Sequence, residues 1–190
     1  MNWLTYEPRP QDVPSARFMT DSGFPDHLAR IQRPEAEAAE EWRVAMEWWR
    51  QLDRFLVAPT GLLAWGTRGA LATMVVLCRR LMCWQGLPVA KGVYVAPVAY
   101  IEARDLHSRE KYDEVRDAGT LLVAGIGTIE YGAEKEIELI VGLAKQRSRA
   151  GRLTFWLLDP VGTARSAELC QRIDAILGPS VVRLNTPAQE

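Results

Sequence analysis

Apolar positions along this chain alternate between two spacings. Short uninterrupted apolar runs, which are typical of buried strands, alternate with longer segments in which apolar residues recur every three or four positions, as on one face of a helix. The predicted strands are Gly61–Trp65, Val93–Tyr100, Leu121–Ile126, Leu153–Leu158 and Ser180–Leu184. The predicted helices are Glu35–Leu56, Ala70–Trp84, Leu106–Ala118, Glu134–Arg149 and Thr163–Leu177. This alternation predicts an α/β fold with a mostly parallel central sheet of about five strands, covered by helices on both faces.

The first part of the chain lacks such a pattern. Residues 1–34 hold prolines at positions 8, 10, 14, 25 and 34 and show no sustained period. We therefore expect an irregular N-terminal arm, followed by one α/β domain over residues 35–190. Pro97 interrupts the second predicted strand and places it near a sheet edge or a bulge. Thr163 is suited to cap the last helix and Gly178 to end it.

Composition limits the classes of protein to consider. Of the 190 residues, 48% are apolar and 25% are charged, the profile of a soluble globular protein. The 23 lysine and arginine residues nearly balance the 24 aspartate and glutamate residues, so the net charge is −1. This balance argues against a strongly electrostatic nucleic-acid binder but leaves room for a local basic patch.

Cysteine, histidine and hydropathy patterns argue against several kinds of site. Cys78, Cys83 and Cys170 form no CxxC pair, and an odd number of cysteines fits no disulfide framework. His27 and His107 are far apart, so we expect free buried thiols and no metal site. No segment approaches the roughly 20 apolar residues of a membrane span, and the N-terminus lacks the apolar run of a signal peptide. We therefore expect a cytoplasmic protein.

The junction between the first strand and its helix, residues 61–73, has the context of a phosphate-binding loop. The pattern of such a loop is two glycines bracketing four residues, then lysine, then serine or threonine. Gly66 stands at the first glycine, but Leu71 stands at the second and Ala72 at the lysine. Thr73 matches the hydroxyl residue. We therefore interpret the junction as a vestigial phosphate loop that no longer functions, with candidate residues Gly66, Gly69 and Thr73.

At this junction the chain resembles the AAA+ ATPases of the DnaC/IstB type, which are replicative-helicase loaders and transposon helper ATPases. The resemblance extends from about Val13 to Leu184 and rests on the order, spacing and flanking apolar patterns of the motifs. The lead-in Val13–Phe18 looks like that family's entry segment. The resemblance implies a P-loop NTPase-like, three-layer fold.

The same resemblance locates further positions of an ATPase site. Residues 119–127 lie where the family has its Walker B strand, normally an apolar run ending in two aspartates, and Ala124 and Gly125 occupy the aspartate positions. Asp159 lies near the polar sensor position, and Ile176 occupies the position of the arginine finger.

These replacements remove the chemistry that ATP hydrolysis needs. The lysine supplies charge and hydrogen-bond donors to the phosphates, so Ala72 forfeits a large share of phosphate affinity. Without an acidic pair, magnesium loses its carboxylate ligands and water its activating group. We therefore predict a protein that is not an enzyme and holds no cofactor. Two other interpretations stay open: an unrelated α/β protein with a tight glycine turn, and a domain that still binds ADP weakly.

The resemblance then implies a protein-binding module of the DNA replication machinery. Its partner is expected to be a replicative helicase or another AAA+ subunit, which it binds as an adaptor, a loader or an inhibitor. The chain is compatible with a phage or mobile-element source, and an oligomer is not excluded. The alternative function is a weak nucleotide-binding or residual ATPase subunit in replication or transposition, with direct contact to DNA.

Two surfaces are candidates for these contacts. The first helix holds three tryptophans, and Trp48 falls off its main apolar stripe. Because tryptophan is enriched at interface hot spots, we predict protein binding across Arg17, Phe18, Trp42, Trp48 and Trp49. The competing interpretation is that all three tryptophans pack in the core. For the DNA alternative, the candidate residues are the basic cluster Arg147, Arg149 and Arg152.

Overall fold

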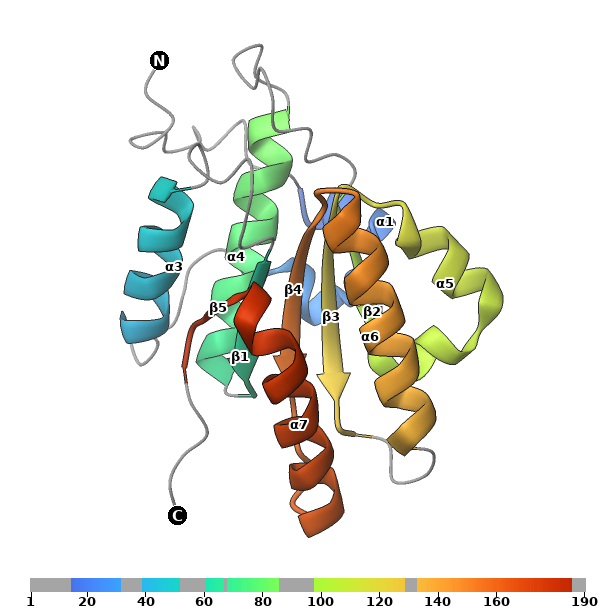
Figure 1. Ribbon diagram of the computed structural model, residues 1–190. Coiled ribbons are helices and arrows are strands. Elements are labelled where there is room, and N and C mark those ends of the chain that lie inside the picture. The colour runs from blue at the N-terminus through green and yellow to red at the C-terminus, as the bar shows by residue number, and fades with distance from the viewer. Residues whose placement is uncertain are drawn as a thin grey trace.

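The computed structural model describes residues 15–31, 39–51, 61–66, 68–85, 98–128 and 133–185. Within these ranges the chain forms an α/β fold whose sheet has five strands, all parallel (Figure 1). The strands are β1 (Gly61–Trp65), β2 (Val98–Glu102), β3 (Thr120–Ile126), β4 (Leu153–Leu158) and β5 (Val182–Arg183). Their order across the sheet is β2-β3-β4-β1-β5. The predicted fold class, an α/β protein with a mostly parallel sheet of about five strands, is confirmed.

Helices cover both faces of this sheet. The helices are α1 (Ala16–Asp21), α2 (Asp26–Ala29), α3 (Ala39–Gln51), α4 (Arg68–Gln85), α5 (Arg109–Arg116), α6 (Ala133–Arg149) and α7 (Ala164–Leu177). Two 3₁₀ helices, η4 (Ala103–His107) and η5 (Gly178–Ser180), connect elements. Figure 1 shows α6 and α7 in front of the sheet and α4 behind it.

Successive residues of each strand pack on opposite faces of the sheet. In β1, Leu62 and Ala64 join the core that lies under α1 to α4, whereas Leu63 and Trp65 join the core under α5 to α7. Residues of β3 and β4 alternate in the same way. Because both faces are covered, the strands are continuous apolar runs without polar alternation, as expected for a parallel sheet.

The segment predicted to be irregular contains two short helices. Ser15 caps α1 with its side chain, which accepts a hydrogen bond from the Phe18 amide at 3.3 Å. Met19, Phe24 and Leu28 are buried and form part of the core with α4. The prediction missed these helices because six and four residues are too short to display a helical period.

Other boundaries differ by a few residues or lie outside the described residues. The polar helix predicted over 106–118 is divided into η4 and α5. Thr163 caps the start of α7 and Gly178 its end, both as predicted. Gly178 has right-handed helical backbone and is also the first residue of η5. Pro97 and the first part of the predicted second strand lie outside the described residues, as do both ends of the predicted first helix. In the described ranges, no helix is both long and apolar enough to cross a membrane.

Candidate functional site

The three segments that resemble ATPase motifs end side by side. β4 lies between β1 and β3, so the loop after β1, the sensor position after β4 and the Walker B position in β3 are neighbours. In open parallel sheets, ligands bind outside the carboxyl ends of the strands. This edge of the sheet is therefore the expected location of a ligand site.

The loop after β1 is too short to wrap a phosphate. Helix α4 begins at Arg68, so only Gly66 and Thr67 separate it from β1. Leu71 and Ala72, aligned with the second glycine and the lysine, lie inside the helix, and Ala72 is buried. A phosphate loop uses a run of loop amides that face the ligand. Here the amide of Gly66, the loop residue that the structure describes, donates to the carbonyl of Leu158.

A carboxylate stands beside this loop. A Cβ atom on Gly66 would lie 2.8 Å from Oδ1 of Asp159, so that side chain lies directly against the glycine. Asp159 is exposed and its amide donates to the carbonyl of Ile126 at 2.7 Å. A negative charge in this position repels the phosphates that a nucleotide would bring.

The candidate loop residues do not converge on one point. Gly66 is exposed at the loop and Gly69 is half-buried in the first turn of α4. Thr73 is 0% exposed, and its Oγ1 has no hydrogen-bond partner among the described residues. A hydroxyl buried in this way cannot contact a magnesium ion at the sheet edge.

The end of β3, which the sequence comparison set against a Walker B motif, contacts a glutamate from the neighbouring strand. β3 has one extra residue between Val123 and Ile126 relative to β4, and Gly125 in this bulge has a positive φ of 66°. A Cβ atom on Gly125 would collide with Oε2 of Glu102, the last residue of β2. The left-handed backbone therefore favours glycine at this position, and any larger residue would also displace the end of the Glu102 side chain.

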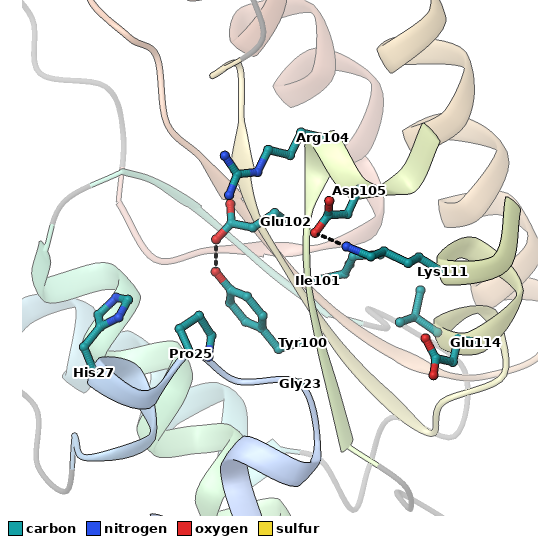
Figure 2. A pocket seen from close by; sticks show the side chains of 11 residues that line it. Gly23, Pro25, His27, Tyr100, Ile101, Glu102, Arg104, Asp105, Lys111 and Glu114 are labelled. Carbon is teal, nitrogen blue, oxygen red and sulfur yellow. Dashed lines mark hydrogen bonds and ion pairs between the residues drawn. The ribbon is translucent and has the colours of Figure 1, made fainter. Parts of the chain in front are cut away.

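Glu102 belongs to a cavity of about 520 Å³ beside β2. The hydroxyl of Tyr100 donates a hydrogen bond to the Glu102 carboxylate (Figure 2). Burial and the neighbouring Glu102 raise the pKa of Tyr100, so it stays a protonated donor. The cavity is lined by Gly23, Pro25, His27, Tyr100, Ile101, Glu102, Arg104, Asp105, Lys111, Glu114 and Val115.

Sequence reasoning missed this cavity. Its walls come from the α1–α2 connection, the end of β2 with η4, and α5. Asp105 and Lys111 form an ion pair across two of these segments, at 2.9 Å. The one feature of the sequence that could have indicated it is Glu102, an acidic residue at the end of an apolar strand. Residues at the carboxyl ends of parallel strands often contact ligands.

A second polar group lies buried beneath the end of β3. The Gly127 amide donates to Oε1 of Glu136 at 3.2 Å, and the Ser166 hydroxyl donates to the Gly127 carbonyl. Glu136 is 1% exposed, and its Oε2 has no hydrogen-bond partner within the described part of the chain. Burial raises the pKa of the Glu136 carboxyl, and it also raises the pKa of Cys170 to about 12. The Cys170 thiol is therefore buried and protonated at neutral pH.

The predicted protein-binding surface is wrong for two tryptophans. Trp48 and Trp49 are 2% and 4% exposed, and Trp48 packs edge-on against Phe155 with ring centroids 5.5 Å apart. The apolar face of α3 is wider than its main stripe and contacts both α4 and the sheet, so Trp48 falls inside it. Trp42 is half-buried under the guanidinium of Arg80, 4.8 Å from its ring centroid.

The other two residues of that surface remain accessible. Arg17 is exposed on α1, and the Phe18 side chain is 55% exposed. The apolar Ile176, which occupies the arginine-finger position, is 47% exposed on α7.

The three arginines of the basic cluster do not form one exposed surface. Arg147 is 1% exposed, and burial and the neighbouring Arg152 lower its pKa to about 10. It donates to Thr154 Oγ1 at 2.8 Å and to four backbone carbonyls, those of Val115, Arg116, Ala118 and Leu153. Arg152 pairs with Asp117 at 2.6 Å. Only Arg149 of the three predicted residues is fully exposed, because the other two hold secondary-structure ends together.

Comparison with known proteins does not assign the chain to a family. No protein-family model matches it, and no curated protein matches it significantly. Over the ranges the structure describes, no group of three or more histidine, cysteine, aspartate or glutamate side chains is arranged to hold a metal ion.

Proposed function

We propose that this chain is a non-catalytic, AAA+-like protein-binding module of the DNA replication machinery. It adopts a P-loop NTPase-like fold and binds a replicative helicase or a partner AAA+ subunit, as an adaptor, a loader or an inhibitor. The resemblance to DnaC/IstB-type loaders provides the class of partner. The protein acts in the cytoplasm.

One observation carries the proposal. The segments aligned with the phosphate loop, the sensor and Walker B meet at one sheet edge, yet each has lost its chemistry. The phosphate-loop amide is bonded to Leu158, Asp159 opposes phosphate, and the Walker B position is Gly125. A sheet that retains the arrangement but fills the site is what we expect of a scaffold that functions through its surface.

The partner surface is proposed to include Arg17 and Phe18. Phe18 is a large apolar side chain exposed on α1, and an aromatic contact can contribute 2 kcal/mol or more to binding, about a thirtyfold change in affinity. The alternative with direct DNA contact loses its main support, because Arg147 is buried.

The test uses purified candidate helicases and AAA+ subunits from the native host, identified by mass spectrometry of proteins that co-purify with the chain. Phe18→Ala should weaken binding at least tenfold without lowering the melting temperature, because the side chain is exposed. Trp48→Ala is the contrasting variant: it should cost roughly 3–5 kcal/mol of stability, because the ring is buried. The proposal fails if no helicase or AAA+ subunit binds the wild-type chain, and the surface assignment fails if Phe18→Ala binds normally.

A further inference from the structure

The cavity beside β2 carries an inference that rests on the proposed protein-binding function. We propose that it accepts an arginine side chain from the partner protein, with Glu102 as the principal counter-charge.

The size and location of the cavity suit a bound side chain. Its volume of about 520 Å³ lies within the range of known ligand pockets, roughly 300–1,000 Å³. It lies beside β2, the outermost strand of the sheet, and the residues that directly follow that strand form part of its wall. His27, Arg104 and Glu114 on its rim are exposed, so a residue on another protein can reach it.

The charges favour a cation. Three carboxylates line the cavity, Glu102, Asp105 and Glu114, against two permanent cations, Arg104 and Lys111. The ion pair between Asp105 and Lys111 satisfies one charge of each sign. Two carboxylates then remain against one arginine, and that arginine is exposed and can move toward solvent.

The site around Glu102 is built, because neighbouring residues adapt to its carboxylate. Tyr100 donates to it from below, and Gly125 leaves space for Oε2 that any other residue would fill. Figure 2 shows Tyr100 and Pro25 next to each other on one side of the carboxylate. A planar guanidinium can form two parallel hydrogen bonds to a carboxylate and stack on flat side chains, which an ammonium group cannot.

Substitution of Arg104 distinguishes a cationic ligand from an anionic one. Figure 2 shows its guanidinium extending alongside Glu102, so it competes with an incoming cation. Arg104→Ala should therefore leave arginine binding unchanged or tighten it. If the cavity instead binds an anion, the same change removes the main attractive charge and should abolish binding.

The experiment is an amide NMR titration of the full chain with acetyl-Gly-Arg-Gly-amide. Matched peptides carry citrulline, a neutral analogue of arginine, or glutamate in the central position. We expect saturable shifts at Ile101, Lys111 and Val115 for the arginine peptide only, weakened about tenfold or more by Glu102→Gln. Glu110→Gln is the control, since Glu110 is exposed on α5 and does not line the cavity.

Four results would overturn the proposal: no saturable shift with the arginine peptide, equal binding of the citrulline peptide, unchanged affinity in Glu102→Gln, or loss of binding in Arg104→Ala. Melting curves establish that each variant is folded. The partner assay separates this proposal from the function on which it rests. If the wild-type chain and Glu102→Gln bind the partner equally, the arginine assignment is wrong while the binding function stands. If the wild-type chain binds no partner, the function itself fails.

Discussion

Arg147 is buried, and its side chain links several elements, although it was predicted to be a surface charge. Its guanidinium donates to three buried acceptors, the hydroxyl of Thr154 and the carbonyls of Val115 and Ala118. Arg147→Met removes every donor of this side chain and leaves these buried acceptors without it, at about 1–3 kcal/mol each. We expect a loss of at least about 3 kcal/mol, or roughly 6–12 °C in melting temperature for a domain of this size.

The control for this change is Arg149→Ala. Arg149 is exposed and lies two residues away on the same helix, so its removal should change stability by no more than about 0.5 kcal/mol. Thermal unfolding followed by circular dichroism compares the two variants. Equal melting temperatures would contradict the structural role of Arg147.

Glu136 is the residue whose charge should limit stability at neutral pH. Its carboxyl is buried with one oxygen unpaired, and burial raises its pKa above the ordinary value of 4.5. A raised pKa in the folded state favours folding below the unfolded pKa, and that advantage is lost as the pH rises through the folded value. Glu136→Gln removes the charge while keeping an acceptor for the Gly127 amide.

We therefore expect Glu136→Gln to melt at a higher temperature than the wild-type chain at pH 8, by roughly 2–4 °C for each kcal/mol gained. The difference should shrink toward zero below about pH 4.5, where both side chains are neutral. Thermal unfolding over pH 4 to 8 measures it. A variant that is less stable at pH 8, or a difference independent of pH, would contradict the prediction.

At the scale of elements, the sequence predicts strand boundaries most accurately where both faces of the strand are buried. β3 and β4 were found within one residue because both faces of each strand are covered, which produces unbroken apolar runs. Helix α3 was found, but the outward face assigned to Trp48 was wrong, because a helix packed on both α4 and the sheet has a wide apolar face. Helices α1 and α2 were missed because one turn of helix carries no measurable period.

The bulge in β3 provides a test of why position 125 is glycine. Gly125→Ala should destabilise the domain by about 1–3 kcal/mol from its left-handed backbone alone, with an added cost from the contact with Glu102. In the double variant Gly125→Ala, Glu102→Ala, the steric part should disappear and the backbone part should remain. A chemical-denaturation cycle of the four proteins measures both. Strictly additive effects would mean that Glu102 does not constrain this position.

At the scale of the whole molecule, the candidate site could be predicted only in part. The candidate loop residues could be proposed from the sequence because they are contiguous in the chain, and their origin as a phosphate loop stays a prediction. The cavity beside β2 did not, because it combines the segments 23–27, 100–105 and 111–115, which only the folded topology brings together. Residue types indicated that the side chains of a phosphate site are missing. The structure adds that α4 begins at Arg68, so positions 71 and 72 lie inside a helix.

The position of residues 71 and 72 inside α4 can be tested by restoring the phosphate-loop sequence. If only residue types had changed, Leu71→Gly with Ala72→Lys would restore a phosphate-loop pattern from Gly66 to Thr73 and with it some affinity for nucleotide. Because positions 71 and 72 lie inside α4 and Asp159 faces the junction, we expect no binding of Mg-ATP at millimolar concentration by either the wild-type chain or the double variant. A lysine at the buried position 72 should instead lower the melting temperature, since it places a charge in the core. Calorimetric titration with Mg-ATP measures the affinity, and a dissociation constant in the low micromolar range for either protein would show that a working phosphate site persists.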